Sequence, residues 1–189
     1  NTLKSLPQFR NGAVVAKILN SWGVTGIVLK YRLPSDEIMK DKSVGPLEDA
    51  QRAIQYVREN AAQLNINPDK IGIMGFSAGG HLASTASTHF DKDYIYYPNH
   101  ISLRPDFSSP GEPGRSRMVS LTHRGSRDNL LGKNPSPETA KDFSNELQVT
   151  KNTPPTFIVL ANDDNGVNPE NSIKYYEALL KNHVPAEMH

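Results

Sequence analysis

Residues 70–80 read KIGIMGFSAGG, and this stretch predicts a strand that runs directly into a helix. Its first half is apolar and contains the β-branched residues Ile71 and Ile73, which is typical of a buried strand. Small residues follow, and residues 78–90 continue as a predicted helix. The two elements meet at Ser77, so this serine is expected to lie on a tight strand-to-helix turn.

The turn carries the pattern G-x-S-x-G, formed by Gly75, Ser77 and Gly79. A serine on such a turn is held above the sheet with its hydroxyl exposed, while the glycines leave room for the strained backbone and for close helix packing. The N–H of Ala78 and the positive end of the helix dipole then face the place where an oxyanion develops. We predict Ser77 as a nucleophile, Ala78 as an oxyanion-hole donor, and Gly75 and Gly79 as the glycines of a nucleophile elbow. The alternative is a glycine-rich turn in which Ser77 only caps the helix.

Strands and helices alternate on both sides of this turn. Residues 24–31 and 155–161 are short runs rich in β-branched side chains, and they predict two further buried strands. Residues 11–22, 45–64 and 168–182 carry apolar side chains at helical spacing. This alternation predicts an α/β fold with a mostly parallel sheet and helices on both of its faces.

Local signals give the expected helix ends and buried faces. Asn11 is the expected N-cap of the first helix, and Gly23 follows its expected end. In the last helix, the side chains expected to face the core are Ile173, Tyr176, Leu179 and Leu180.

Residues 108–117 read SSPGEPGRSR and predict an irregular loop. Proline removes a backbone hydrogen-bond donor from a strand, and glycine lowers the stability of a strand because it has no side chain to pack. We therefore expect no strand to pass through Pro110 and Gly111, or through Pro113 and Gly114.

Two carboxylates follow the predicted strand at residues 155–161, namely Asp163 and Asp164. An acid at the end of a strand downstream of the nucleophile suits the chain order Ser…Asp/Glu…His. Such an acid holds an imidazole in one tautomer and stabilises the imidazolium formed during attack. Asp164 is the predicted acid and Asp163 the second choice. The alternative is an ordinary Asp-Asn-Gly turn without a catalytic role.

The composition narrows the classes of function. The 189 residues include 21 Lys+Arg and 20 Asp+Glu, and the resulting net charge of +1 argues against a nucleic-acid or polybasic membrane partner. Because the sequence has no cysteine, disulfide scaffolds, thiolate zinc sites and cysteine nucleophiles are excluded. No apolar run approaches the roughly 18 residues of a membrane span. The sequence also lacks metal and nucleotide motifs, so no metal and no cofactor is expected.

Four stretches together resemble the α/β-hydrolase superfamily and, within it, the bacterial esterases related to acetyl-xylan esterases and other carbohydrate acetyl esterases. They are GFSAGGHLAS at residues 75–84, DDNGVNPENSIKYY at residues 163–176, YRLP at residues 31–34 and PLEDA at residues 46–50. The resemblance implies a serine-dependent hydrolase of short-chain esters, often acetyl esters of carbohydrates, that requires no cofactor.

By the same resemblance, Ser77 matches the nucleophile of the family, Asp164 matches the acid, and Ala78 supplies one oxyanion-hole N–H. The implied reaction passes through an acyl-enzyme. The implied partner is a small-molecule or carbohydrate ester, and the resemblance is compatible with a secreted or periplasmic bacterial enzyme.

The sequence departs from the family pattern in three respects. It has no HGGG-like segment before the first strand and no Gly-His-Gly loop after the last, and residues 108–117 replace a central strand. We therefore expect residues 1–189 to be one domain that is incomplete at both ends, with the catalytic histidine outside the chain. His189 follows Asp164, so chain order permits it as the base, but its place at the start of a predicted strand argues against that role. His81, on the helix that Ser77 opens, is expected to have a packing or capping role.

Two interpretations follow from these residues. The first is a serine esterase. The second, suggested by the missing donor and base, is a non-catalytic module with an α/β-hydrolase-like fold. A peptidase or a lactone hydrolase has the same strand-to-helix turn and is an alternative within the enzymes.

Overall fold

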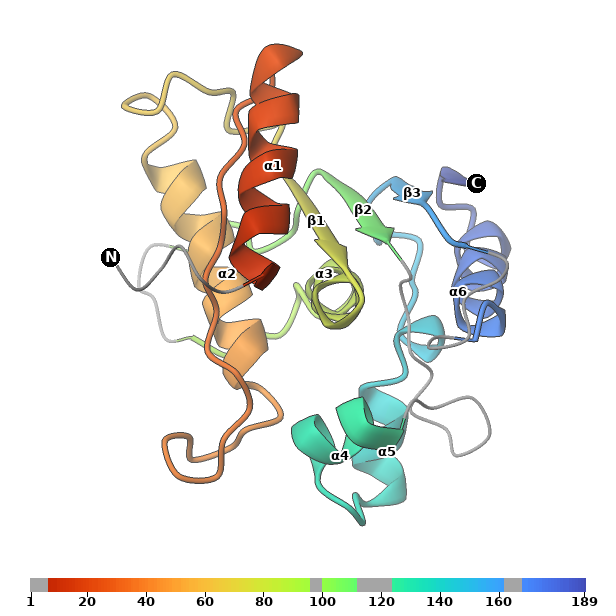
Figure 1. The fold of residues 1–189 in the computed structure, drawn as a ribbon. Coiled ribbons are helices and arrows are strands. Elements are labelled where there is room, and N and C mark those ends of the chain that lie inside the picture. Colours follow the sequence, from red (N-terminus) through yellow and green to blue (C-terminus); the bar gives the residue numbers. More distant parts are fainter. Residues whose placement is uncertain (1–6, 96–99, 112–123, 162–167) are drawn as a thin grey trace. The chain divides into compact units, whose positions relative to one another are not determined.

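The computed structural model describes residues 7–95, 100–111, 124–161 and 168–189 of the chain (Figure 1). Its contacts divide the chain into two compact units, Asn1–Tyr31 and Arg32–His189.

The first unit consists of the helix α1 (Pro7–Ser21) and the extended residues that follow it. The helix begins at Pro7, so the expected N-cap Asn11 lies inside the helix and that prediction is wrong. Proline is favoured in the first turn because the N–H that it lacks has no acceptor there. The helix ends as predicted, with Gly23 at a φ of +77° just beyond it.

Residues 24–31 do not form the strand that their sequence predicts. They are extended, but no strand is assigned to them within the described part of the chain, and Ile27 is 54% exposed. Their recorded backbone contacts are local, such as the N–H of Gly26 donating to Asn20 Oδ1 at 2.8 Å. A run of β-branched residues indicates suitability for a pleated surface, but it does not supply the partner that a strand requires.

The second unit contains a four-stranded sheet in the order β1-β2-β3-β4. All neighbouring pairs are parallel. The strands are β1 (Gly72–Phe76), β2 (Phe107–Gly111), β3 (Thr156–Ile158) and β4 (Ala186–Met188). Parallel strands alternating with helices confirm the predicted α/β class.

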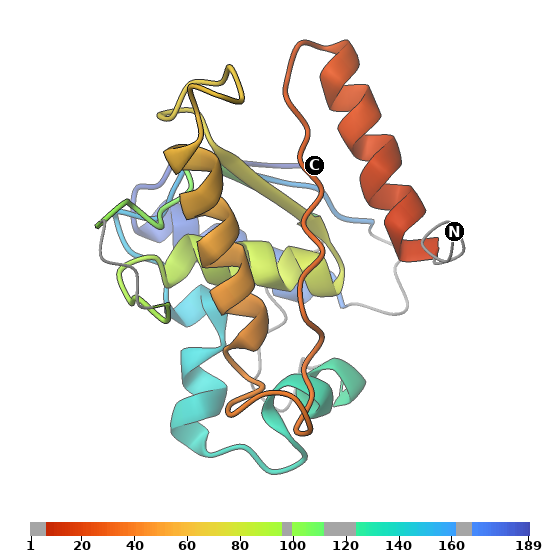
Figure 2. The same cartoon turned by 90° about the vertical axis from the view of Figure 1, so that its left-hand side faces the viewer.

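Helices α3 (Ala78–Thr88) and α6 (Glu170–Lys181) of this unit pack on the sheet, and the other helices of the unit lie elsewhere along the chain or against these two. These others are α2 (Gly45–Glu59), α4 (Arg124–Leu131), α5 (Pro137–Asp142) and the 3₁₀ helix η2 (Asn145–Leu147). Helix α3 packs on β1 and β2, α2 packs on α3, and α6 packs on β4 and η2 (Figures 1 and 2). The helix predicted at residues 45–64 is shorter than expected and ends at Glu59.

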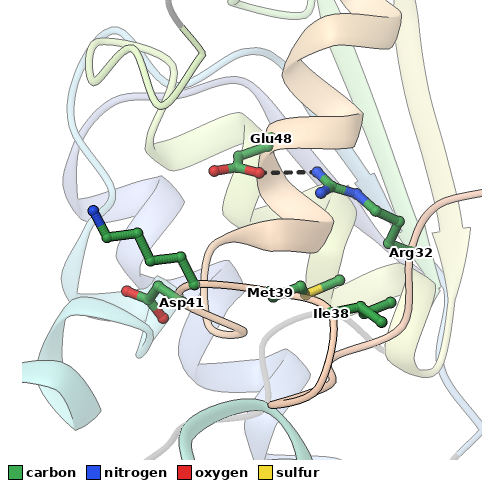
Figure 3. Close-up of a pocket in the computed structure, with 6 residues that line it drawn as sticks. Arg32, Ile38, Met39, Asp41 and Glu48 are labelled. Atoms are coloured by element: carbon green, nitrogen blue, oxygen red, sulfur yellow. Dashed lines mark hydrogen bonds and ion pairs between the residues drawn. The ribbon is translucent and has the colours of Figure 1, made fainter.

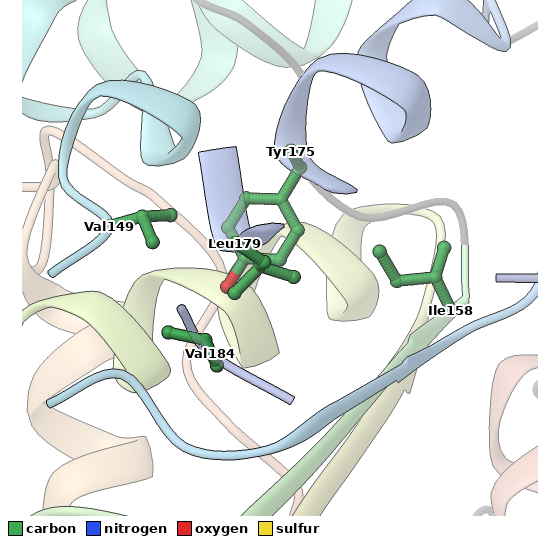
Figure 4. Close-up of a cluster of buried hydrophobic side chains, with 5 residues drawn as sticks. All are labelled: Val149, Ile158, Tyr175, Leu179 and Val184. Carbon is green, nitrogen blue, oxygen red and sulfur yellow. The ribbon is translucent and has the colours of Figure 1, made fainter. Parts of the chain in front are cut away.

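A hydrophobic cluster forms the core between α6 and the strands β3 and β4. Its buried members are Val149, Ile158, Tyr175, Leu179 and Val184 (Figure 4). The prediction for Leu179 is confirmed. Tyr176 is partly buried and packs against the cluster, Ile173 is partly buried, and Tyr175, which the sequence does not predict to face the core, is completely buried. Leu180 is 49% exposed, so its predicted inward position is wrong. The buried face of α6 therefore contains Tyr175 and Leu179, and it is turned away from Leu180 relative to the face predicted from the sequence.

Strand β2 corrects the prediction of an irregular loop at residues 108–117. Residues 107–111 pair with β1 along their whole length, and residues 112–117 lie outside the described part. The N–H of Ser108 donates to Pro155 O at 2.9 Å, which is the side of β3. Since the direction of the N–H groups alternates along a strand, the missing donor of Pro110 also faces β3. The proline therefore leaves the pairing with β1 intact.

The missing donor has a visible effect on the other side of β2. Pairing between β2 and β3 consists of Ser108 with Thr156, and it resumes beyond the proline as an isolated bridge between Gly111 and Val159. The strand can thus pass through Pro110, because the missing N–H interrupts the hydrogen bonds to β3 and leaves those to β1 unaffected.

Candidate active site

Ser77 is the single residue between the end of β1 and the start of α3. It is exposed, and its backbone has φ 53° and ψ −119°. A positive φ is rare for a residue other than glycine, and this ψ lies far from the left-handed helical region, so the residue is strained. Its side chain makes no capping hydrogen bond to α3. The capping alternative therefore lacks the hydrogen bond that defines it.

The glycines around Ser77 have different surroundings. A Cβ on Gly75 would lie 2.2 Å from Gly79 O, so only glycine fits where the turn closes on β1. A Cβ on Gly80 would lie 2.1 Å from Gly111 O, at the end of β2. At Gly79, by contrast, a Cβ would meet nothing within 4 Å. The close backbone approaches therefore involve Gly75 and Gly80, and Gly80 lies outside the pattern G-x-S-x-G.

Ala78 is the first residue of α3 and is exposed. The N–H groups of the first helical turn have no acceptor inside their own helix, and they carry the positive end of the helix dipole. Ala78 therefore lies at the helix terminus where the sequence predicts an oxyanion-hole donor.

The candidate acids Asp163 and Asp164 lie in residues 162–167, outside the described part of the chain. The described residues on either side are Ala161, three residues beyond β3, and Asn168, whose Oδ1 accepts the N–H of Glu170 at 2.9 Å. Because β1, β2 and β3 are parallel, β3 ends at the edge of the sheet where Ser77 follows β1.

His189 is held in the ladder between β4 and β3. Its N–H donates to Ile158 O at 3.0 Å, its carbonyl accepts the N–H of Leu160 at 2.9 Å, and its ring lies 5.4 Å from that of Phe157. Strand β4 is three strand spacings from β1, which is about 14 Å. An imidazole acting as base needs to be within hydrogen-bond reach of the serine, so this geometry argues against His189 in that role.

Two further histidines are buried. His81 is 4% exposed on α3, and its Nε2 lies 3.3 Å from Phe143 O. His89, one residue beyond α3, has its Nε2 3.0 Å from Asp142 O. Burial lowers the pKa of His89 below its ordinary value, which keeps its ring neutral near pH 7. Both side chains are packed, as the sequence predicts for His81.

A hollow of about 410 Å³ lies beside the first turn of α2 (Figure 3). It is lined by Arg32, Ile38, Met39, Lys40, Asp41 and Glu48. The guanidinium of Arg32 lies 2.9 Å from Glu48 Oε2 and 2.8 Å from Asp49 Oδ1, so its charge is compensated. The hollow does not include Ser77, and it has no excess of positive charge to attract an anion.

Within the described residues, no helix combines the length and the apolar content that spanning a membrane requires. The same residues contain no cluster of three or more His, Asp or Glu side chains arranged to hold a metal ion.

Known sequences provide an independent comparison. Residues 8–179 match the profile of the BD-FAE family. An acetylxylan esterase of Xylanibacter ruminicola is 37% identical over 165 residues, which is 85% of this chain and 32% of that protein. Endo-1,4-beta-xylanase B of Butyrivibrio fibrisolvens is 41% identical over 146 residues, which is 74% of this chain and 22% of that protein. The chain thus spans about a third or less of the length of these relatives.

Solved structures are similar over a larger share of their length. An acetyl ester-xyloside bifunctional hydrolase from Caldicellulosiruptor lactoaceticus has a TM-score of 0.83 and 42% identity, over 93% of this chain and 63% of that one. A lipase/esterase from Lactobacillus plantarum has a TM-score of 0.76 and 22% identity, over 95% of this chain and 72% of that one. The second similarity concerns the fold alone.

Proposed function

The chain belongs to the BD-FAE family and has an α/β-hydrolase fold, and from this premise we propose that the complete gene product hydrolyses carboxylic esters with Ser77 as its nucleophile. The observation that carries the proposal is the exposed, strained backbone of Ser77 between β1 and α3. Strain of this kind persists only where the surrounding structure imposes it, and it is concentrated at functional sites. The esterase names of the relatives support the same class of reaction.

In the proposed reaction, Ser77 Oγ attacks the ester carbonyl while a histidine, which follows the acid in the chain order of this fold, takes the hydroxyl proton. The Ala78 N–H stabilises the oxyanion that forms. The bond from the carbonyl carbon to the alcohol oxygen then breaks, and the imidazolium gives its proton to the leaving alcohol. Water attacks the resulting acyl-enzyme, releases the acid and restores Ser77. Asp164 orients the histidine, with Asp163 as the second choice.

We propose an acetyl or other short acyl group on a carbohydrate as the substrate. Two relatives support this choice by their names, an acetylxylan esterase and an acetyl ester-xyloside bifunctional hydrolase. The expected result is release of acetate from acetylated xylo-oligosaccharides, with slower turnover of long-chain acyl esters. Cleavage of a peptide or a lactone in preference to these esters contradicts the proposed substrate class, but it does not affect the assignment of Ser77 as the nucleophile.

Hydrolysis of p-nitrophenyl acetate by the Ser77→Ala variant tests the nucleophile directly. We expect kcat to fall by about 10⁴-fold or more, because removing one member of such a catalytic unit removes most of its effect. Ser87→Ala is the matched control. Ser87 is a buried serine of α3, the helix that follows Ser77, and its hydroxyl donates to Ala83 O at 2.8 Å. Turnover by Ser77→Ala at the rate of the control contradicts the assignment.

A fluorophosphonate probe separates an enzyme from a non-catalytic module of the same fold. An activated serine displaces fluoride and becomes covalently labelled, whereas an ordinary hydroxyl reacts slowly. We expect labelling within minutes at Ser77, identified by peptide mass, and none in Ser77→Ala. A wild-type protein that stays unlabelled supports the non-catalytic alternative.

The acid is assigned by comparing Asp164→Asn with Asp163→Asn. Replacing the acid of such a triad by its amide leaves the side-chain volume unchanged and lowers kcat by up to about 10⁴-fold, since the imidazole takes the wrong tautomer. We expect the large loss in Asp164→Asn and a small one in Asp163→Asn. The reverse pattern moves the role to Asp163, and two small losses remove both carboxylates from the mechanism.

A further inference from the structure

We propose that His81 is a positioning residue for Ser77, which together with Asn145 ties the first turns of α3 to the buried segment at residues 143–145. This inference rests on the proposed function, because it concerns how the nucleophile is held in place. It assigns no proton transfer to His81.

The first link joins His81 to Ser77 through the backbone. The N–H of His81 donates to Ser77 O at 3.0 Å and closes the first turn of α3. His81 thus belongs to the turn of α3 that starts at the carbonyl of Ser77. A displacement of His81 therefore moves the carbonyl of Ser77 with it.

The second link joins the ring of His81 to the neighbouring segment. Its Nε2 lies 3.3 Å from Phe143 O, and the side chain is almost completely buried. A carbonyl oxygen only accepts, so this contact requires the hydrogen on Nε2. Nδ1 is then the acceptor, and Thr85 Oγ1 lies 3.4 Å from it. The single hydrogen of the Thr85 hydroxyl is directed at His81 O at 2.8 Å, so the contact that holds the ring is the one from Nε2 to Phe143 O.

A third link comes from Asn145, which is fully buried at the start of η2. Its Nδ2 donates to Ser84 Oγ at 2.7 Å and to Thr85 Oγ1 at 3.0 Å. The hydroxyls of Ser84 and Thr85 lie 2.9 Å and 2.8 Å from His81 O. The amide of Asn145 therefore reaches His81 O directly, with its Nδ2 3.3 Å away, and also through the two hydroxyl groups.

These links explain how a strained serine is maintained. The backbone of Ser77 leaves its unfavourable conformation unless the residues on both sides are fixed, and α3 is the element that follows it. Strand β1 fixes the residue before Ser77, while His81 and Asn145 fix the helix after it. A displacement of about 1 Å at a reacting group costs up to about 100-fold in rate.

Two substitutions at His81 test the proposal in the complete gene product. In His81→Gln the amide nitrogen is separated from Cα by as many bonds as Nε2 is, so it can donate to Phe143 O, whereas His81→Phe fills the space without a donor. We expect His81→Phe to lower kcat for p-nitrophenyl acetate by about 10- to 100-fold with KM unchanged. His81→Gln is expected to restore most of kcat and to keep the wild-type dependence of kcat/KM on pH.

A second pair of variants covers the case in which His81→Phe fails to fold. Thr85→Val removes the hydroxyl that bridges Asn145 and His81, whereas Thr88→Val removes an equally buried hydroxyl that bonds to Ser84 O and Thr85 O further along the helix. We expect Thr85→Val to lower kcat several-fold and Thr88→Val to leave it unchanged. Equal losses in the two variants overturn the proposal, since they indicate a general effect of weakening α3.

The outcomes also separate this inference from the proposed function. If the wild type and Ser77→Ala are equally inactive, the proposed function is wrong. If the wild type is active but His81→Phe matches it, or His81→Gln is as impaired as His81→Phe, the positioning role is wrong and the esterase assignment stands. A changed pH profile in His81→Gln overturns the positioning role in favour of proton transfer by His81.

Discussion

Gly79 and Gly80 are adjacent in the sequence, yet the surrounding structure constrains only one of them. Gly80 lies against the carbonyl of Gly111, so α3 approaches the end of β2 too closely at this point to leave room for a Cβ. Gly79 faces open space. The familiar five-residue pattern includes the glycine that tolerates a side chain and omits the one that does not.

This contrast predicts opposite effects of two alanine substitutions on stability. Gly80→Ala is expected to reduce the free energy of unfolding by about 1–3 kcal/mol, because the added Cβ displaces backbone atoms. Gly79→Ala is expected to raise it by about 0.5–1 kcal/mol, since alanine loses less conformational freedom than glycine in a helix. Urea unfolding of the two variants measures both values. A loss in Gly79→Ala as large as that in Gly80→Ala contradicts the geometry.

Tyr175 gives the fold a sensitivity to alkali. Its side chain is completely buried, burial raises its pKa above the ordinary value, and its hydroxyl has no hydrogen-bond partner among the described residues. Above a pH of about 10, the unfolded chain releases this proton while the folded chain retains it, so stability falls as the pH rises.

The corresponding prediction compares Tyr175→Phe with the wild type at two pH values. Between pH 9 and pH 11 the wild type is expected to lose roughly 1 kcal/mol more of its unfolding free energy than the variant does. At pH 8 the variant is expected to be as stable as the wild type or slightly more so, because it leaves no unpaired hydroxyl. Tyr56→Phe, at a side chain that is 55% exposed, is the control and is expected to retain the alkaline loss. An identical alkaline loss in Tyr175→Phe contradicts the prediction.

Between elements, Arg58 of α2 connects the starts of two strands. Its guanidinium donates to Pro68 O at 3.0 Å, to Ser102 O at 2.6 Å and to Asp106 Oδ2 at 2.8 Å. The same oxygen of Asp106 accepts the N–H of Ile71, just before β1, at 2.8 Å. The planar fork of arginine thus aligns the beginnings of β1 and β2 at the edge of the sheet opposite to Ser77.

Lysine cannot reproduce this set of contacts because it has a single nitrogen. We expect Arg58→Lys to lower the free energy of unfolding by about 1–2 kcal/mol, because several acceptors lose their donor, among them the part-buried Arg104 O and Asp106 Oδ2. Arg52→Lys on the same helix is the control, since Arg52 forms a more exposed ion pair with Glu59 at 3.1 Å and should change stability by less than about 1 kcal/mol. Thermal unfolding of both variants checks the difference, and equal shifts contradict it.

The sequence predicts some of these elements and not others, for physical reasons. The strand and helix around Ser77 are predictable because an apolar run, small residues and a turn pattern agree with one another. Strand β2 is not, since the side on which Pro110 lacks its donor depends on the orientation of a strand that the sequence does not reveal. In α6, burial of Tyr175 rather than Leu180 depends on the rotation of the helix against β3 and β4.

At the candidate site, the sequence predicts the position of Ser77 and Ala78 but not the residues that support them. The close approach at Gly80 and the contacts of His81 with Phe143 depend on segments far apart in the chain. Local patterns carry no information about such contacts. The roles of Asp163, Asp164 and the catalytic histidine stay predictions.

At the scale of the whole molecule, the pairing of the sheet is uneven. Among the described residues, β1 and β2 pair along their whole length, whereas the pairs between β2 and β3 lie on either side of Pro110. Ser77 follows β1, and the segment with the candidate acids follows β3. In the proposed enzyme, the nucleophile and the acid therefore follow strands on opposite sides of the sparsely paired boundary between β2 and β3.

Proteins open first along boundaries where few interactions cross, well before they unfold completely. We expect this boundary to act as a seam between two cooperative units, so that in urea the esterase activity disappears at lower concentration than the far-ultraviolet circular dichroism signal. The buried contacts of Asn145 with α3 cross the same boundary outside the sheet, so Thr85→Val should widen the gap between the two transitions, whereas Thr88→Val should not. Coincident transitions in all three proteins contradict the seam. If activity is lost before the circular dichroism signal, one proline in β2 determines both how the sheet is paired and which property of the enzyme urea removes first.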